Sequence, residues 1–114
     1  MTQTLFSFHP PETPAMSEYL EYCKTDIGRK SVDFDRRNPH VGELFIRYSE
    51  QAFKSGRSRF SSKAIFERLR WDLAFTTDDA EFKISNNHTA YYARKLMAFM
   101  PKFDGFFMMR EKAS

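Results

Sequence analysis

The chain has 114 residues, of which 41% are hydrophobic and 29% charged, and its mean hydropathy is −0.61. This composition predicts one small globular domain. It excludes a disordered chain and an integral membrane protein, since no apolar run approaches the roughly 18–20 residues of a membrane span. The net charge is only +3, but residues 1–53 hold six basic against eight acidic residues and residues 54–114 hold twelve against seven. The second half should therefore attract polyanions, unless its charge only keeps the domain in solution.

An N-terminal arm, residues 1–33, is expected to precede the main domain. Three of the five prolines fall within residues 1–14, which favours an extended segment. Residues 15–27 repeat apolar side chains at helical spacing and predict a short helix, which ends at Gly28 and is followed by a linker. The lone Cys23 excludes an internal disulfide, and the first residues lack the basic region of a secretory signal, so we expect a cytoplasmic protein.

The main domain, residues 34–114, opens with a strong helix signal at Asn38 and Pro39. Asparagine favours the N-cap and proline the first helical position, while Gly56 favours the end of the helix. One apolar stripe runs between these signals and consists of Val41, Leu44, Phe45, Tyr48 and Ala52. This is the clearest helix of the sequence.

Two further helices and three short strands complete the predicted domain. The helices are expected at about residues 61–75 and 86–100, and the strands at Phe60, residues 82–84 and residues 106–109. This order predicts an α+β, mainly helical fold: a winged helix-turn-helix-like three-helix domain with a small antiparallel sheet. The connection between the second and third helices is longer than in a tight helix-turn-helix, so a small α+β fold without a DNA role stays open.

No constellation of residues predicts catalysis or metal binding. The three histidines and the one cysteine lack ligand spacing, and no glycine-rich phosphate loop is present. Asp78, Asp79 and Glu81 could hold Mg²⁺ in a nuclease, but three acids in a polar loop are more often only solvated. We therefore expect no catalytic residue, no metal, no cofactor and no enzymatic activity.

From about Phe34 to residue 112, the chain resembles a family of small uncharacterised phage and prophage proteins. The segments that carry the resemblance are NPHVGELFIRY, SGRSRFSSKAIFERLRWD, FKISNNHTAYYARKLM and FDGFF. The resemblance implies a phage origin and a compact helix-rich domain, but no activity and no site residue. It also suggests a second class of function, because small phage proteins often bind and disable host proteins, including defence systems.

The third predicted helix suggests binding to duplex DNA. Helical spacing turns Ala90, Ala93, Leu96, Met97 and Met100 inward. The opposite side and the helix start then carry the expected groove contacts, which are Asn86, Asn87, His88, Tyr91, Arg94 and Lys95. Further basic residues are expected to hold phosphates: Lys63, Arg68, Arg70, Lys102 and Arg110. The main hypothesis is thus a DNA-associated or transcriptional regulator. The alternative is that these charges form an ordinary solvated face.

The arm suggests a different function, an inhibitor that binds a host protein. Its candidate contact residues are Leu5, Phe6, Phe8, Tyr19 and Leu20, beside a pair of prolines. The same arm could instead form a homodimer through residues 1–30 or pack on its own domain.

Overall fold

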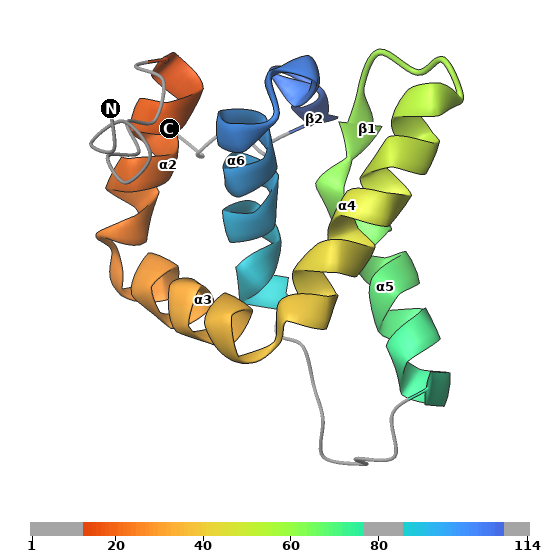
Figure 1. Cartoon of the computed structure of the whole chain (residues 1–114), viewed down its shortest axis with the longest axis horizontal. Helices are drawn as coiled ribbons and strands as arrows, with labels where there is room; N and C mark the ends of the chain where they lie inside the picture. The colour runs from red at the N-terminus through yellow and green to blue at the C-terminus, as the bar shows by residue number, and fades with distance from the viewer. Residues whose placement is uncertain (1–12, 77–85, 109–114) are drawn as a thin grey trace, which may run out of the picture.

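The computed structural model describes residues 13–76 and 86–108, and helices carry most of this part of the chain (Figure 1). The helices are α2 (Pro14–Cys23), α3 (Asp26–Arg37), α4 (Pro39–Lys54), α5 (Ser62–Thr76) and α6 (Thr89–Phe99). Two 3₁₀ turns flank the last helix, η1 (Asn86–His88) and η2 (Pro101–Phe103), and the two strands are β1 (Phe60–Ser61) and β2 (Phe107–Met108). None of the described helices combines the length and the apolar character that crossing a membrane requires.

The predicted winged α+β fold with an antiparallel sheet is wrong, although the chain is mainly helical. The strands β1 and β2 are two residues long and pair in parallel, with Phe60 opposite Phe107. Phe106 and Phe107 are both buried, whereas successive side chains of a strand point to opposite faces. The apolar run at residues 106–109 was expected to be a strand of the sheet, but its phenylalanines fill the core. A short apolar run does not by itself distinguish a strand from another kind of buried segment, which is why the prediction failed. The strand expected at residues 82–84 lies outside the described residues.

The region expected to hold one helix and a linker forms two helices, α2 and α3. The helix is interrupted at Lys24 and Thr25, between α2 and α3. The Thr25 hydroxyl accepts a hydrogen bond from the Gly28 amide at 2.9 Å and so caps the start of α3. Gly28 therefore lies in the first turn of α3 instead of ending a helix. A Cβ atom at Gly28 would lie 1.8 Å from the carbonyl oxygen of Tyr22, so the corner between the two helices requires a residue without a side chain.

The helix signals around α4 and α5 are confirmed. Pro39 is the first residue of α4, as expected, and Asn38 stands at the N-cap position. The Asn38 side chain makes no cap hydrogen bond to α4, because its amide instead donates to the Phe34 carbonyl of α3 at 3.0 Å. Gly56 follows α4 with a φ of +93°, in the left-handed region that glycine occupies without strain. The second predicted helix is α5, which begins at Ser62.

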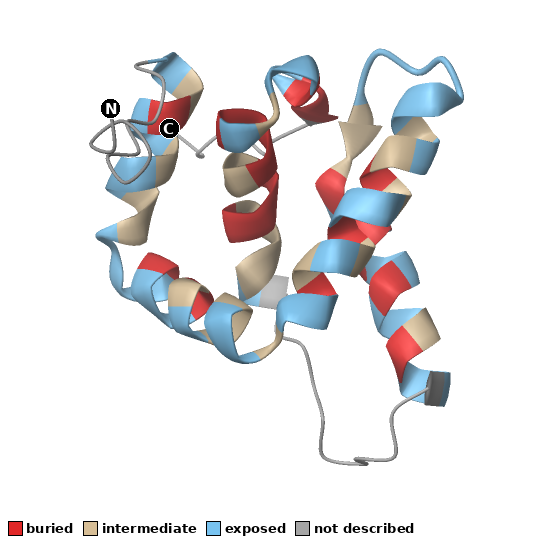
Figure 2. Ribbon diagram, viewed as in Figure 1, coloured by how far each residue is buried: buried red, intermediate tan, exposed pale blue. Residues whose placement is uncertain are grey.

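Helix α6 forms the centre of the fold, since α2, α3, α4 and α5 all contact it. Figure 2 shows buried residues over most of its length. Burial is confirmed for most of the expected core, namely Val41, Phe45, Ile65, Leu69, Leu73, Ala93, Leu96 and Met97. Leu44 and Tyr48, also expected inside, are half-buried. Aromatic rings from η2, β2 and the turn between them also belong to the core, namely Phe103, Phe106 and Phe107.

Candidate functional site

The third predicted helix corresponds to α6, but its expected outer face is not an open surface. Tyr91 is 2% exposed, so its prediction as an outward groove contact is wrong. The expectation came from placing a single apolar stripe on the helix. Because other helices surround α6, residues on several sides of it are buried, including the neighbouring Tyr92.

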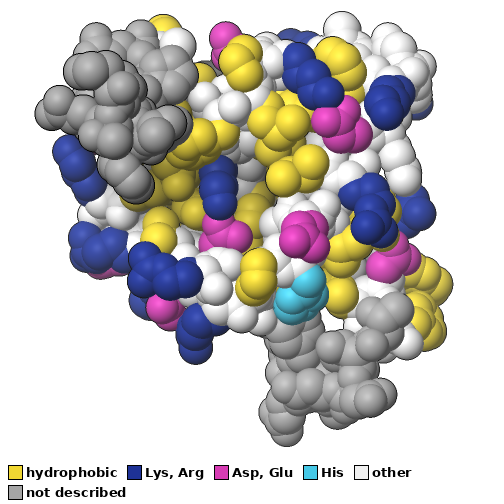
Figure 3. Space-filling model, in the orientation of Figure 1, with side chains coloured by type: hydrophobic (Ala, Val, Ile, Leu, Met, Phe, Trp, Pro, Cys, Tyr) yellow, Lys and Arg dark blue, Asp and Glu magenta, His cyan; other side chains and the backbone are white. Residues whose placement is uncertain are grey.

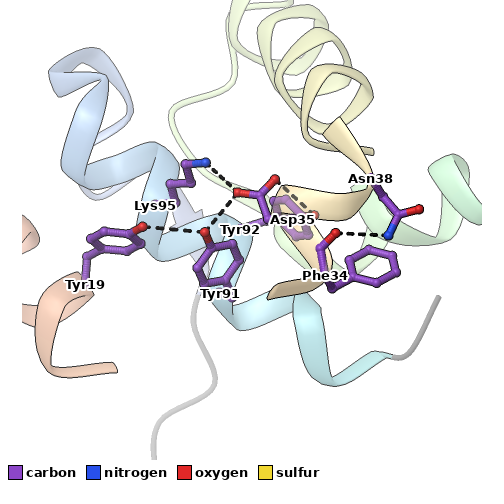
Figure 4. Close-up of polar contacts among 7 residues, drawn as sticks. All are labelled: Tyr19, Phe34, Asp35, Asn38, Tyr91, Tyr92 and Lys95. Atoms are coloured by element: carbon purple, nitrogen blue, oxygen red, sulfur yellow. Dashed lines mark hydrogen bonds and ion pairs between the residues drawn. The ribbon is translucent and has the colours of Figure 1, made fainter. Parts of the chain in front are cut away.

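Asp35 of α3 accepts hydrogen bonds from three side chains of α6 (Figure 4). The Tyr91 hydroxyl donates to it at 2.9 Å, the Tyr92 hydroxyl at 3.4 Å and the Lys95 ammonium at 2.5 Å. The hydroxyl of Tyr19 in α2 lies 3.5 Å from that of Tyr91. This Asp35 network therefore ties α2, α3 and α6 together, and it pairs the ammonium of Lys95, whose side chain is 42% exposed, with a carboxylate.

The tyrosines of the Asp35 network are held as neutral hydrogen-bonding groups. Burial raises the pKa of Tyr91 and Tyr92, and the nearby Asp35 carboxylate raises both further. Burial also raises the pKa of Tyr19 to about 12. Phenols with raised pKa values are poor proton donors at neutral pH, so the arrangement favours a structural role over acid–base chemistry.

Arg94, another expected groove contact, lies between α6 and α2. Its guanidinium carbon is 4.5 Å from the ring centroid of Tyr22, and its Nε atom is 3.7 Å from a carboxylate oxygen of Glu18. The side chain is only 18% exposed. Arg94 therefore contributes to the packing of α2 on α6 and presents little charge to solvent.

The residues expected at the start of the recognition helix form the turn η1. His88 is half-buried, stacks on the Phe34 ring at a centroid distance of 4.5 Å, and has its Nδ1 atom 2.8 Å from the buried Ser31 hydroxyl. Asn87 is exposed, and Asn86 is the first residue of the turn. His88 thus fixes η1 to α3 and is not free to enter a groove.

Stability should depend on pH through His88. Burial lowers the pKa of His88 below its ordinary value of 6.5, so the unfolded chain binds a proton at a higher pH than the folded one. The contribution of the neutral, buried His88 to the free energy of unfolding is therefore complete above pH 6.5. It is lost as the pH falls from 6.5 through the pKa of His88 in the folded chain. Urea unfolding at pH 7.5 and 5.5 should show a lower free energy of unfolding at pH 5.5. We expect H88Q to reduce this difference. An equal difference in H88Q and wild type would contradict the assignment.

The residues expected to hold phosphates differ in their exposure and in the contacts that their charged groups make with neighbouring side chains. Arg68 lies 4.7 Å from the ring centroid of Tyr48 and 3.4 Å from Asp72, and Lys102 is 2.7 Å from Glu50. Lys63 and Arg70 are exposed on α5. Arg110 lies outside the described residues. Arg70 also interacts with a neighbouring group, so Lys63 has the clearest access to a partner among the four cations that the structure describes.

The candidate contacts of the arm are only partly described. Leu5, Phe6 and Phe8 lie outside the described residues. Tyr19 is half-buried against α6, while Leu20 is 46% exposed. The host-protein and homodimer hypotheses therefore stay predictions.

A cationic surface lies on the connection between α4 and α5, and of its residues only Lys63 was expected from the sequence to contact a partner. Lys54, Arg57, Arg59 and Lys63 are all exposed there, and we call these four residues the cationic connection. No acidic residue occurs between Glu50 and Glu67, which was the sequence signal for it. The Arg57 guanidinium lies 5.6 Å from the ring centroid of Phe60, so its charged head is positioned by an aromatic ring and not by a carboxylate.

Within residues 13–76 and 86–108, no group of three or more His, Cys, Asp or Glu side chains is arranged so that it could bind a metal ion. The acids at positions 78, 79 and 81, considered above for Mg²⁺, lie outside the described residues. Cys23 is half-buried in α2.

Comparisons of the chain with protein-family models, with curated proteins and with solved structures found no match. The resemblance to phage and prophage proteins therefore stays a prediction.

Proposed function

We propose that the protein binds nucleic acid by its phosphate backbone and that the cationic connection makes the contact. The observation that carries this proposal is the lack of carboxylate partners there. Among the described residues, none of the recorded ion pairs involves Lys54, Arg57, Arg59 or Lys63. Four exposed cations within ten residues are the kind of surface that neutralises successive phosphates.

The distribution of ion pairs elsewhere supports the choice of this surface. Lys95 and Arg94 of α6 lie near Asp35 and Glu18. In α3 and at Lys24, which follows α2, basic side chains stand among acidic ones in the sequence. The lower left of Figure 3 shows both signs of charge on one part of the surface. Ion pairs there join Lys24 to Glu21, Arg29 to Asp26 and Arg37 to Asp33. A polyanion approaching those helices would meet both signs of charge, whereas the cationic connection presents only one.

This proposal retains the nucleic-acid partner expected from the sequence but moves the contact from the third helix to the α4–α5 connection. Phosphate contacts give affinity and position without sequence information. We therefore expect binding with little dependence on base sequence and a steep dependence on salt.

Two matched triple variants test the proposal. R57Q/R59Q/K63Q removes three charges from the cationic connection, and K24Q/R29Q/R37Q removes three charges from the ion-paired side. Fluorescence anisotropy of a labelled oligonucleotide between 50 and 200 mM salt gives the affinity and its salt dependence. We expect the first variant to bind at least about tenfold more weakly with a shallower salt dependence, and the second to stay within about twofold of wild type.

Equal losses in the two variants would show that net charge alone drives binding and would contradict the proposed site. No binding by the wild-type protein at 50 mM salt would contradict the proposed function itself. Circular dichroism of both variants would confirm that the helices remain formed.

A further inference from the structure

Two large aromatic side chains lie on the outside of α5. Trp71 is 65% exposed and Phe75 is 72% exposed, and their rings meet edge to face at a centroid distance of 5.0 Å. The buried side of the same helix carries Ile65 and Leu69, so the aromatic pair points away from the core. Trp and Phe are the side chains that gain most from burial, and an exposed pair of them is a candidate contact surface.

The aromatic pair lies further along α5 than the cationic connection, with Lys63 about 80° from Trp71 around the helix axis. Lys63 stands in the first turn of the helix, and a rise of 1.5 Å per residue places Trp71 about 12 Å further along the axis. At 100° per residue, Arg68, Trp71 and Phe75 fall within about 60° of one another around the helix. Arg68 therefore provides a partly exposed cation on the same side as the rings.

The charges around the aromatic pair favour bases over phosphates at this end of α5. Glu67 is exposed on the helix, and Asp72 follows Trp71 directly. Carboxylates repel phosphates, whereas a base presents an uncharged ring face. The beginning of α5 is thus suited to a sugar–phosphate backbone and its end to bases.

We infer that Trp71 and Phe75 stack on the bases of a single-stranded nucleic acid whose phosphates lie on the cationic connection. This inference rests on the proposed function and specifies its ligand. The bases of a duplex are paired and stacked on each other, so an aromatic side chain on a helix surface cannot reach their faces. A positively charged track beside aromatic rings is the combination by which proteins bind single strands with little sequence preference.

Trp71 is the only tryptophan of the chain, so its fluorescence reports directly on this position. The probe is an oligothymidylate of about 12 nucleotides, a length within the usual range for such sites. We expect it to quench Trp71 fluorescence on binding, while a fully paired DNA hairpin of similar size leaves the fluorescence unchanged. W71A should bind the single strand about 5-fold to 100-fold more weakly, and W71F, which retains an aromatic face, should recover most of the affinity.

The outcomes separate this inference from the proposed function. If a labelled oligothymidylate binds but Trp71 fluorescence and the affinity of W71A stay unchanged, the stacking inference is overturned and the phosphate site stands. If the wild-type protein binds no oligonucleotide at low salt, both are overturned. If sedimentation shows a dimer that W71A dissociates, and W71A leaves oligonucleotide affinity unaltered, the aromatic pair is instead a contact between copies. Because Trp71 is exposed, W71A should melt close to wild type, which a thermal scan checks.

Discussion

Replacement of Gly28 by alanine is expected to lower the free energy of unfolding by about 3–5 kcal/mol, which is among the larger effects of single substitutions. The new methyl group would lie 1.8 Å from the carbonyl oxygen of Tyr22 and 2.8 Å from the Cα atom of Cys23. Both are backbone atoms, so no side chain can rotate away to relieve the overlap. The α2–α3 corner would have to open, and α2 would lose its packing against α6. Urea unfolding followed by circular dichroism measures the effect.

Gly56 supplies the matched control for this substitution. It has a φ of +93°, and a Cβ atom at Gly56 would have no atom of the described residues beyond its chain neighbours within 4 Å. G56A should therefore cost only the strain of a left-handed alanine, about 1–2 kcal/mol. A loss in G28A no greater than that in G56A would show that the corner between α2 and α3 adapts easily.

Replacement of Asp35 by alanine is expected to lower the free energy of unfolding by about 2–4 kcal/mol. The change removes the acceptor shared by Tyr91, Tyr92 and Lys95. Two buried phenols then lose a charged partner, and buried donors without acceptors are costly. Chemical denaturation of D35A against wild type measures the difference.

Asp33 provides a control on the same helix. It forms an exposed ion pair with Arg37 at 2.8 Å, and exposed pairs contribute little, so D33A should cost less than about 1 kcal/mol. In a double-mutant cycle, Y91F should cost less in the D35A background than in wild type, because its hydrogen bond is already lost. Equal effects of D35A and D33A would show that the Asp35 network does not stabilise the fold.

The helices α4 and α5 could be predicted because their signals are local. Asn38 and Pro39 mark the start of α4, and regular apolar spacing marks its buried face. Helix α3 was missed for a physical reason. Its buried positions include Gly28 and Ser31, which are small or polar, so its sequence lacks an apolar stripe. The periodicity of α3 therefore lies in the charged residues of its exposed side and not in large apolar residues of its buried side.

Only part of the candidate site could be predicted from the sequence. The acid-free run from residue 51 to residue 66 is a local signal for the cationic connection. The Asp35 network is not local, since 56 residues separate Asp35 from Tyr91. A periodic pattern shows that a helix has an apolar side, but it does not show how many neighbours surround that helix. Tyr91 and Lys95 therefore looked like an outer face until the positions of α2 and α3 were known.

The central position of α6 has a consequence for how the protein is made. It is the last α-helix of the described chain in sequence, yet the four helices synthesised before it all pack against it. On the ribosome, the earlier helices emerge without the shared surface on which they bury their apolar side chains. Neighbouring helices such as α4 and α5 contact each other directly, but the docking of all four on α6 must await the synthesis of residues 89–99. A chain cut before Thr89 therefore loses the element that joins the other helices, and the protein acquires its tertiary structure late in translation.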